Sequence, residues 1–174
     1  AEYIEIKENP DMEFTPKTYI FGAKAAPGYY MAKQIIRLIH AIKELVENDP
    51  VTKDKLKVVY LENYSVSLSE RLMPASEISE QISLAGTEAS GTGNMKFMIN
   101  GAVTFGTYDG ANVEIKHCCG AENFIQFGME TPEVNALKAA GYSPKKYIAQ
   151  SPILQKVMTL LRNGINGNYF NEIE

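Results

Sequence analysis

The sequence is poor in residues that bind metals or form disulfides. Its 174 residues include two cysteines and two histidines. The cysteines, Cys118 and Cys119, are adjacent, and neighbouring residues rarely have the geometry of a disulfide. His117-Cys118-Cys119 is a cluster of soft ligands, but three consecutive side chains do not converge easily on one tetrahedral ion. We therefore expect no metal site, reduced cysteines and a cytoplasmic protein.

The chain also lacks an excess of basic residues and a long apolar segment. It has 17 Lys and Arg against 21 Asp and Glu, whereas a nucleic-acid binder needs a basic surface. No apolar run approaches the roughly 18 residues of a membrane span, and no signal peptide opens the sequence. We predict a protein that binds neither nucleic acid nor membrane and is not secreted. The 45% of hydrophobic residues suffices for the core of one domain.

Short β-rich runs alternate with helical patterns through the middle of the chain. The expected strands are residues 18–21, 56–61, 80–83, 102–107 and 123–127. Apolar residues recur at three- and four-residue steps between Met31 and Val46, which predicts a long amphipathic helix. This alternation predicts an α/β fold with a parallel sheet.

Several helix starts are marked by capping residues. Ser67-Leu-Ser-Glu70 has the spacing of a capping box, and Thr131, Ser143 and Ser151 each precede a proline. We divide the chain into a stub of helix and loop (1–17), a central core (18–130) and C-terminal helices (131–174). Because the stub begins with the end of a helix, we expect the chain to be cut from a larger protein.

Three loops that follow strands are candidate ligand sites, because parallel sheets bind ligands at the carboxyl ends of their strands. They are residues 22–28, 62–65 and 86–94. The third loop combines glycines with hydroxyl groups at Thr87, Ser90 and Thr92, and a helix follows it. Such a loop suits a phosphate, but its spacing matches neither a P-loop nor a dinucleotide fingerprint. A glycine-rich turn is more often only a turn.

Lys96 follows this loop within about one helical turn. Its neighbours Met95, Phe97, Met98 and Ile99 are apolar, which leaves two interpretations. Either the lysine extends along the surface, or its amine is desolvated and free to attack an aldehyde. A reactive amine beside an anion site suggests pyridoxal phosphate, which has an aldehyde and a phosphate.

Glu88-Ala-Ser-Gly-Thr-Gly-Asn-Met-Lys-Phe-Met98, followed by Asn100-Gly101, resembles the pyridoxal-phosphate signature of the α-glucan phosphorylases. Further similar segments occur in the order that the family has them: Gly22-Ala-Lys-Ala-Ala-Pro-Gly28, Leu61-Glu-Asn-Tyr64, Ser79-Glu-Gln-Ile-Ser83 and Asp109-Gly-Ala-Asn-Val-Glu114. The resemblance extends from about Thr15 to Gly164. It implies a Rossmann-like sheet with helices on both faces, in part of the C-terminal domain of a GT-B type glycosyltransferase.

The resemblance also implies roles for individual residues. Lys96 would form the Schiff base with pyridoxal 5'-phosphate, and Thr92 and Gly93 would bind its phosphate. The residues that would line the cofactor are Tyr64, Val66 and Gln81, and those that would bind the sugar are Glu88, Ser90 and Gly91. The implied reaction is phosphorolysis of terminal α-1,4-linked glucose to glucose 1-phosphate, with the cofactor phosphate as proton shuttle. The implied partners are an α-1,4-glucan, inorganic phosphate, the missing N-terminal domain and a second subunit in a homodimer.

Departures from the family pattern lead us to expect that these 174 residues alone are inactive. A basic segment and the N-terminal domain, which help to hold the phosphates, are absent from the sequence, and such electrostatic stabilisation is usually the largest catalytic contribution. Ser65 stands where animal members have an arginine beside the cofactor.

Two other functions remain open. One is a module that binds a nucleotide or phosphosugar without chemistry, and the other is a structural piece that dimerises through a bare apolar face.

Overall fold

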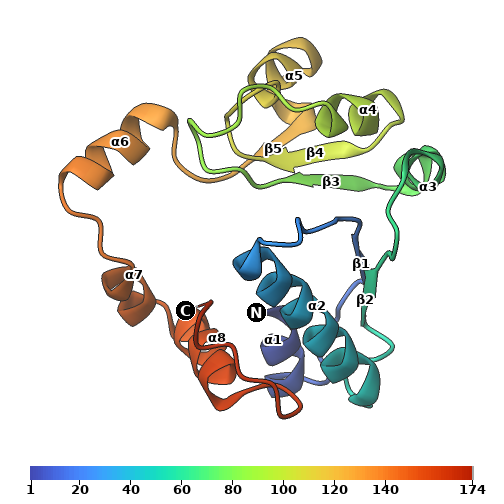
Figure 1. Ribbon diagram of the computed structural model, residues 1–174, viewed down its shortest axis with the longest axis vertical. Coiled ribbons are helices and arrows are strands. Elements are labelled where there is room, and N and C mark those ends of the chain that lie inside the picture. The colour runs from blue at the N-terminus through green and yellow to red at the C-terminus, as the bar shows by residue number, and fades with distance from the viewer. Residues whose placement is uncertain (174) are drawn as a thin grey trace. The chain divides into compact units, whose positions relative to one another are not determined.

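All the strands that the sequence predicts are formed, and every pair of neighbouring strands is parallel. The computed structural model describes residues 1–173, which form two units: Ala1–Tyr64 with the residues from Ser143 onward, and Ser65–Tyr142 (Figure 1). The strands divide between a two-stranded sheet and a three-stranded sheet, where we expected one sheet. Local alternation predicts strands, whereas their pairing depends on residues distant in the sequence.

The first unit contains α1 (Glu2–Glu8), β1 (Lys17–Phe21), α2 (Tyr30–Asn48), β2 (Leu56–Tyr60), α7 (Pro144–Gln150) and α8 (Pro152–Asn163). The stripe that predicts the long helix becomes α2, whose Val46 packs with Ile6 and Leu56 in a buried cluster. Its Ala41 packs with Ile165 and Phe170 in a second cluster. The helix therefore joins the start and the end of the described chain in one core.

The second unit contains α3 (Val66–Leu72), the 3-10 helix η1 (Met73–Ala75), β3 (Ile78–Gln81), α4 (Gly93–Ile99), β4 (Val103–Gly106), α5 (Asn112–Cys119), the 3-10 helix η2 (Ala121–Asn123), β5 (Phe124–Gln126) and α6 (Thr131–Ala139). Its strands lie in the order β3-β4-β5. Helices α4 and α5, which connect them, lie on the same side of this sheet (Figure 1). Lys116 of α5 donates a hydrogen bond of 2.6 Å to Gln126 of β5, which ties the helix to the sheet.

Three of the expected helix caps are wrong: Ser143 stands at the N-cap position of α7, but its side chain makes no capping hydrogen bond, and two helices begin earlier than predicted. Ser65 caps α3, accepting a hydrogen bond of 3.4 Å from the Leu68 backbone, so the helix begins two residues before the predicted capping box. Helix α6 is preceded by Glu130, whose N–H donates to Glu133, so Thr131 lies inside the helix. Ser151 does cap α8, as predicted. At α3 the side chain that accepts from a free N–H group of the first turn is that of Ser65.

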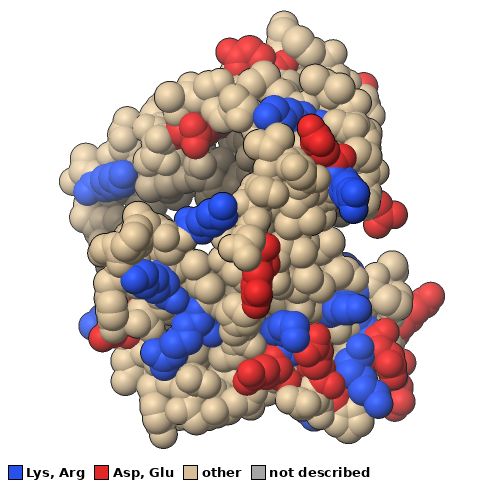
Figure 2. All heavy atoms as spheres, turned by 45° about the vertical axis from the view of Figure 1, so that its right-hand side comes forward, with Lys and Arg blue, Asp and Glu red and all other residues tan. Residues whose placement is uncertain are grey.

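The expected C-terminal helices are formed, but they belong to different units. Helix α6 lies in the second unit, whereas α7 and α8 lie in the first. Figure 2 shows acidic and basic side chains interspersed over the face in view. Within residues 1–173, no helix combines the length and the apolar character needed to cross a membrane.

Candidate functional site

Two loops of the second unit leave the same edge of its sheet. Strand β3 ends at Gln81 and β4 ends at Gly106, and these two residues are register partners. Because the strands are parallel, residues 82–92 and 107–111 start side by side. The glycine-rich loop therefore lies beside the Asp109-Gly110 turn.

Asp109 holds the start of the glycine-rich loop. Its Oδ2 accepts hydrogen bonds from the backbone N–H groups of Glu88, at 2.8 Å, and Thr87, at 3.2 Å. Burial alone would raise the pKa of Asp109, but hydrogen bonds from Glu88, Gly86, Gly110 and Thr87 outweigh it and lower the pKa below its ordinary value. The carboxylate is thus a buried, charged anchor for the backbone of the loop.

The same turn approaches Ser90 so closely that only glycine fits. Gly110 has a φ of +53°, and a Cβ at this position would lie 2.6 Å from the Ser90 carbonyl oxygen. That oxygen accepts a hydrogen bond of 2.7 Å from the Ala111 backbone. Turn chemistry predicts an Asp-Gly pair here, and the structure adds the reason that its glycine is needed.

A buried pair of amides connects α4 to α5. Asn94 Nδ2 donates to Asn112 Oδ1 at 2.9 Å, and Asn112 Nδ2 donates to the Thr107 carbonyl at 3.0 Å. Asn94 Oδ1 accepts from the Met95 backbone at 2.9 Å. Their exposed fractions are 3% and 4%, so both amides are used inside the protein.

The start of α4 offers donors to an anion. Thr92 is the N-cap residue and is exposed, and its side chain makes no capping hydrogen bond. Within residues 1–173, the N–H groups of Gly93 and Asn94 have no acceptor, as expected for the first turn of a helix. These donors suit a phosphate oxygen.

Lys96 is exposed, so of the two interpretations of its apolar neighbours the desolvated amine is wrong. Successive residues of a helix point about 100° apart, and therefore sequence neighbours do not surround one another. Met95 and Ile99 are themselves 38% and 83% exposed. The interpretation that remains is the lysine that extends along the surface.

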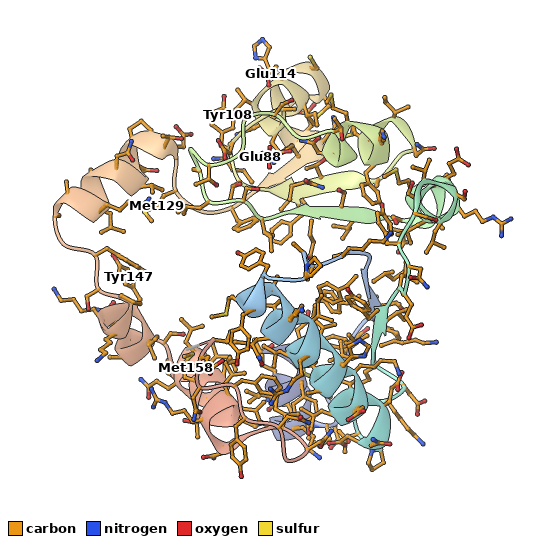
Figure 3. All side chains as sticks on the ribbon, in the orientation of Figure 1. Glu88, Tyr108, Glu114, Met129, Tyr147 and Met158 are labelled. Atoms are coloured by element: carbon orange, nitrogen blue, oxygen red, sulfur yellow. The ribbon has the colours of Figure 1, made fainter. Side chains whose placement is uncertain are left out.

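The other residues singled out by the resemblance differ in their surroundings. Glu88 and Ser90 are exposed on the loop, and Figure 3 shows Glu88 beside the sheet and Glu114 on α5. Gly91 has a φ of +87°. Gln81 donates a hydrogen bond of 2.9 Å to Ser79 Oγ, and Val66, the first residue of α3, is 76% exposed.

Tyr64 belongs to the first unit and packs there on another motif. A Cβ on Gly22 would lie 2.5 Å from the Tyr64 ring, so the ring rests directly on the glycine. The Tyr60 hydroxyl donates to the Ala23 carbonyl at 2.8 Å. The loops after β1 and β2 are therefore joined, as the loops after β3 and β4 are.

The segments that resemble the α-glucan phosphorylases thus make close contacts with one another. These contacts are Gly22 with Tyr64, Gly110 with Ser90, and Asn94 with Asn112. A model of the carbohydrate phosphorylase family matches residues 1–173. The chain belongs to the carbohydrate phosphorylase family. Among its relatives, the glycogen phosphorylase of Synechocystis sp. is 52% identical over 93% of the chain, and the liver form of Homo sapiens is 55% identical over 93%. The brain form of Bos taurus is 51% identical over 99%.

This carbohydrate phosphorylase chain spans only part of those relatives, namely 19% of the length of the Synechocystis and human proteins and 20% of the bovine one. The buried amides and the Asp109 anchor lie inside the matched region. Asn94 and Asn112 each belong to a motif that resembles the family, but the sequence did not predict that their side chains pair. Spacing gives no signal for a hydrogen bond between residues 18 positions apart.

Proposed function

We propose that this chain is part of an α-1,4-glucan phosphorylase, which transfers terminal glucose from a glucan to inorganic phosphate and forms glucose 1-phosphate. The support is its family and its similarity to the glycogen phosphorylases of Synechocystis sp. and Homo sapiens. The observation that carries the proposal is the anchored loop. The Asp109 carboxylate accepts from the N–H groups of Thr87 and Glu88, the Ala111 N–H donates to the Ser90 carbonyl, and Glu88 and Ser90 are exposed.

In the proposed site, the exposed loop binds the sugar. The Glu88 carboxylate accepts hydrogen bonds from sugar hydroxyls, and the Ser90 hydroxyl and the Gly91 backbone bind beside it. Because the backbone of residues 87–90 is already hydrogen-bonded, little conformational entropy is lost when the sugar binds. The loop thus orients the sugar for transfer.

The residues at the start of α4 fit pyridoxal phosphate by their donor chemistry. The unpaired N–H groups of Gly93 and Asn94 and the exposed Thr92 hydroxyl suit its phosphate, and the exposed amine of Lys96 is open to its aldehyde. Tyr64, Val66 and Gln81 are proposed to line the group. When bound, it supplies a phosphate whose second pKa, about 6, suits proton exchange near neutral pH.

We further propose the finer fold and setting that the resemblance implies. The parallel strands and their helices would form part of the C-terminal Rossmann-like domain of a GT-B enzyme, with residues 18–130 as its cofactor-binding core. The partners would be an N-terminal domain, which completes the cleft, and a second subunit. A cytoplasmic location is part of the same proposal.

Cofactor attachment is tested on the chain itself. The chain is incubated with pyridoxal phosphate, reduced with borohydride, digested and analysed by mass spectrometry. We expect the added mass on the peptide that contains Lys96, and its loss in Lys96→Ala but not in Lys138→Ala, which removes another exposed lysine of the same unit. Labelling spread evenly over exposed lysines would contradict the cofactor site. Binding of ATP or NAD without pyridoxal phosphate would favour the non-catalytic module.

The reaction is tested in a chimera, because the chain spans about a fifth of its relatives. The 174 residues replace the matched segment of the Synechocystis protein, and glucose 1-phosphate release from maltodextrin and phosphate is measured. We expect activity in the chimera and in its Lys138→Ala variant, and none with Lys96→Ala. The 174 residues assayed alone should release none. A folded chimera without activity would refute the proposed function.

A further inference from the structure

The second unit contains a cavity of about 600 Å³ beside α4 and α5, the α4–α5 cavity. One wall is made by Met95, Met98 and Ile99 of α4, and Ile115 lies on α5 opposite. Although apolar, Met95 and Ile99 are 38% and 83% exposed, so the cavity is open to solvent. Its volume lies in the range of about 300–1,000 Å³ that is usual for small-molecule sites.

Both cysteines of the chain line this cavity. Cys118 and Cys119 form the last turn of α5 and are seven and eight residues after Ala111, which also lines the wall. Helical spacing therefore puts them on the same stripe as Ile115. Both are free thiols; Cys118 is exposed and Cys119 is half-buried. Two nucleophilic sulfurs thus border an apolar space.

The remaining ionisable group in the wall is Glu114, one turn before Cys118. Its carboxylate is exposed and repels anionic molecules that approach the thiols. The cavity therefore favours a neutral molecule with an apolar part.

We propose that the α4–α5 cavity is a covalent-modification site, where Cys118, and secondarily Cys119, is alkylated by neutral α,β-unsaturated carbonyl compounds that carry an alkyl or aryl tail. The tail occupies the space between Met95, Ile99 and Ile115 and holds the electrophile beside the thiol. Ala89 and Ser90 of the glycine-rich loop also line the cavity, so this site adjoins the proposed sugar-binding residues, but the alkylation itself does not depend on the proposed transferase function.

The reaction needs no oxidant or reductant. The thiol proton passes to water, and the sulfur forms a bond to the β-carbon of the electrophile. The π electrons of the carbon–carbon double bond move to the α-carbon, which takes a proton from water. The product is a thioether with the mass of both reactants.

The test compares maleimides that share one reactive ring and differ in their tails. N-hexylmaleimide, N-hydroxyethylmaleimide and N-carboxyethylmaleimide react with the chain and with glutathione, and intact mass and peptide mapping follow the adducts. Relative to glutathione, we expect the hexyl compound to react with Cys118 about tenfold faster than the hydroxyethyl compound, and the carboxyethyl compound to be slowest. Cys118→Ser and Cys119→Ser assign the sites. If the ratio of the hexylmaleimide rate to the hydroxyethylmaleimide rate is the same for the chain as for glutathione, the proposal is overturned.

Matched variants connect the selectivity to the cavity. The double variant Met95→Gln/Ile99→Gln places polar groups on the wall of the cavity. It should bring the ratio of the hexylmaleimide and hydroxyethylmaleimide rates close to the ratio measured with glutathione. Met129→Gln is the control, because Met129 is a 42% exposed methionine of the same unit outside the cavity. In the unmodified sequence, N-hexylsuccinimide, which has the tail but no double bond, should slow hexylmaleimide labelling. Failure of that competition overturns the proposal even if the double variant does not fold.

Discussion

Replacing Asn94 by alanine tests whether the glycine-rich motif, which contains Asn94, and the motif Asp109–Glu114, which contains Asn112, form one structural unit. Asn94 Nδ2 donates a hydrogen bond to Asn112 Oδ1, and Asn94 Oδ1 accepts one from the Met95 backbone N–H. Both hydrogen bonds are 2.9 Å long. Alanine leaves the Asn112 oxygen without its donor at a position that is 4% exposed. The change therefore removes more than one interaction.

The expected cost follows from these contacts. A buried polar group left without a partner costs about 1–3 kcal/mol, and the lost bond to the Met95 backbone adds about 1 kcal/mol. We expect Asn94→Ala to lower the free energy of opening of the second unit by about 2–4 kcal/mol. At about 1.4 kcal/mol per tenfold, amide exchange in this unit accelerates by about 30- to 1,000-fold.

Hydrogen exchange with mass spectrometry measures this unit separately from the first. Asn135→Ala is the control, because Asn135 is exposed on α6 of the same unit, and it should change the opening free energy by less than about 0.5 kcal/mol. In a double-mutant cycle, Asn94→Ala and Asn112→Ala should be coupled by about 1–2 kcal/mol. The reasoning is refuted if amide exchange in Asn94→Ala is no faster than in Asn135→Ala. It is also refuted if the changes in opening free energy caused by Asn94→Ala and Asn112→Ala are additive.

Three further perturbations have defined outcomes. Gly110→Ala puts a Cβ 2.6 Å from the Ser90 carbonyl oxygen at a φ of +53°, so exchange of residues 87–91 should accelerate more than tenfold; unchanged exchange would contradict the close approach. The pKa of Asp109 is lowered, so its stabilisation is present above the unfolded pKa of about 3.9 and is lost as the pH falls through the lower folded pKa. Asp109→Asn should flatten this acid dependence in unfolding titrations. Burial, a hydrogen bond to Asp49 and the charge of Asp49 raise the pKa of Tyr3 to about 12, so its stabilisation is complete below about pH 10 and is lost between about pH 10 and 12. Tyr3→Phe should remove this alkaline loss and one late step in the phenolate absorbance titration.

The sequence predicted best what depends on local spacing. The stripe between Met31 and Val46 became α2, and the short β-rich runs became strands whose ends lie within two residues of those predicted. Gly141 and Gly164, which follow the ends of α6 and α8, have φ values of +84° and +82°, as is usual for glycines after helices. These features follow from neighbours along the chain, and periodicity records them.

Features that depend on distant residues were not predicted. The division into two sheets and the Asn94–Asn112 pair arise from contacts that no local pattern contains. The caps failed because α3 begins directly after Ser65 and α6 directly after Glu130, which leaves Ser67 and Thr131 inside the helices. For Lys96, the apolar letters around it suggested burial, but on a helix they face other directions.

The exposure of Lys96 changes what the candidate site requires. The anchors of the glycine-rich loop, from Asp109 to the Asn94–Asn112 pair, all lie within residues 86–112, so the loop holds its conformation through this unit alone. A dry surrounding for the amine is not among the properties of the described chain. Loop order and amine desolvation are therefore separable requirements of the proposed site. Loop order depends on hydrogen bonds inside one unit, whereas amine desolvation depends on apolar surface brought against α4. A partner that covers α4 would therefore alter the reactivity of Lys96 without reshaping the proposed sugar-binding loop.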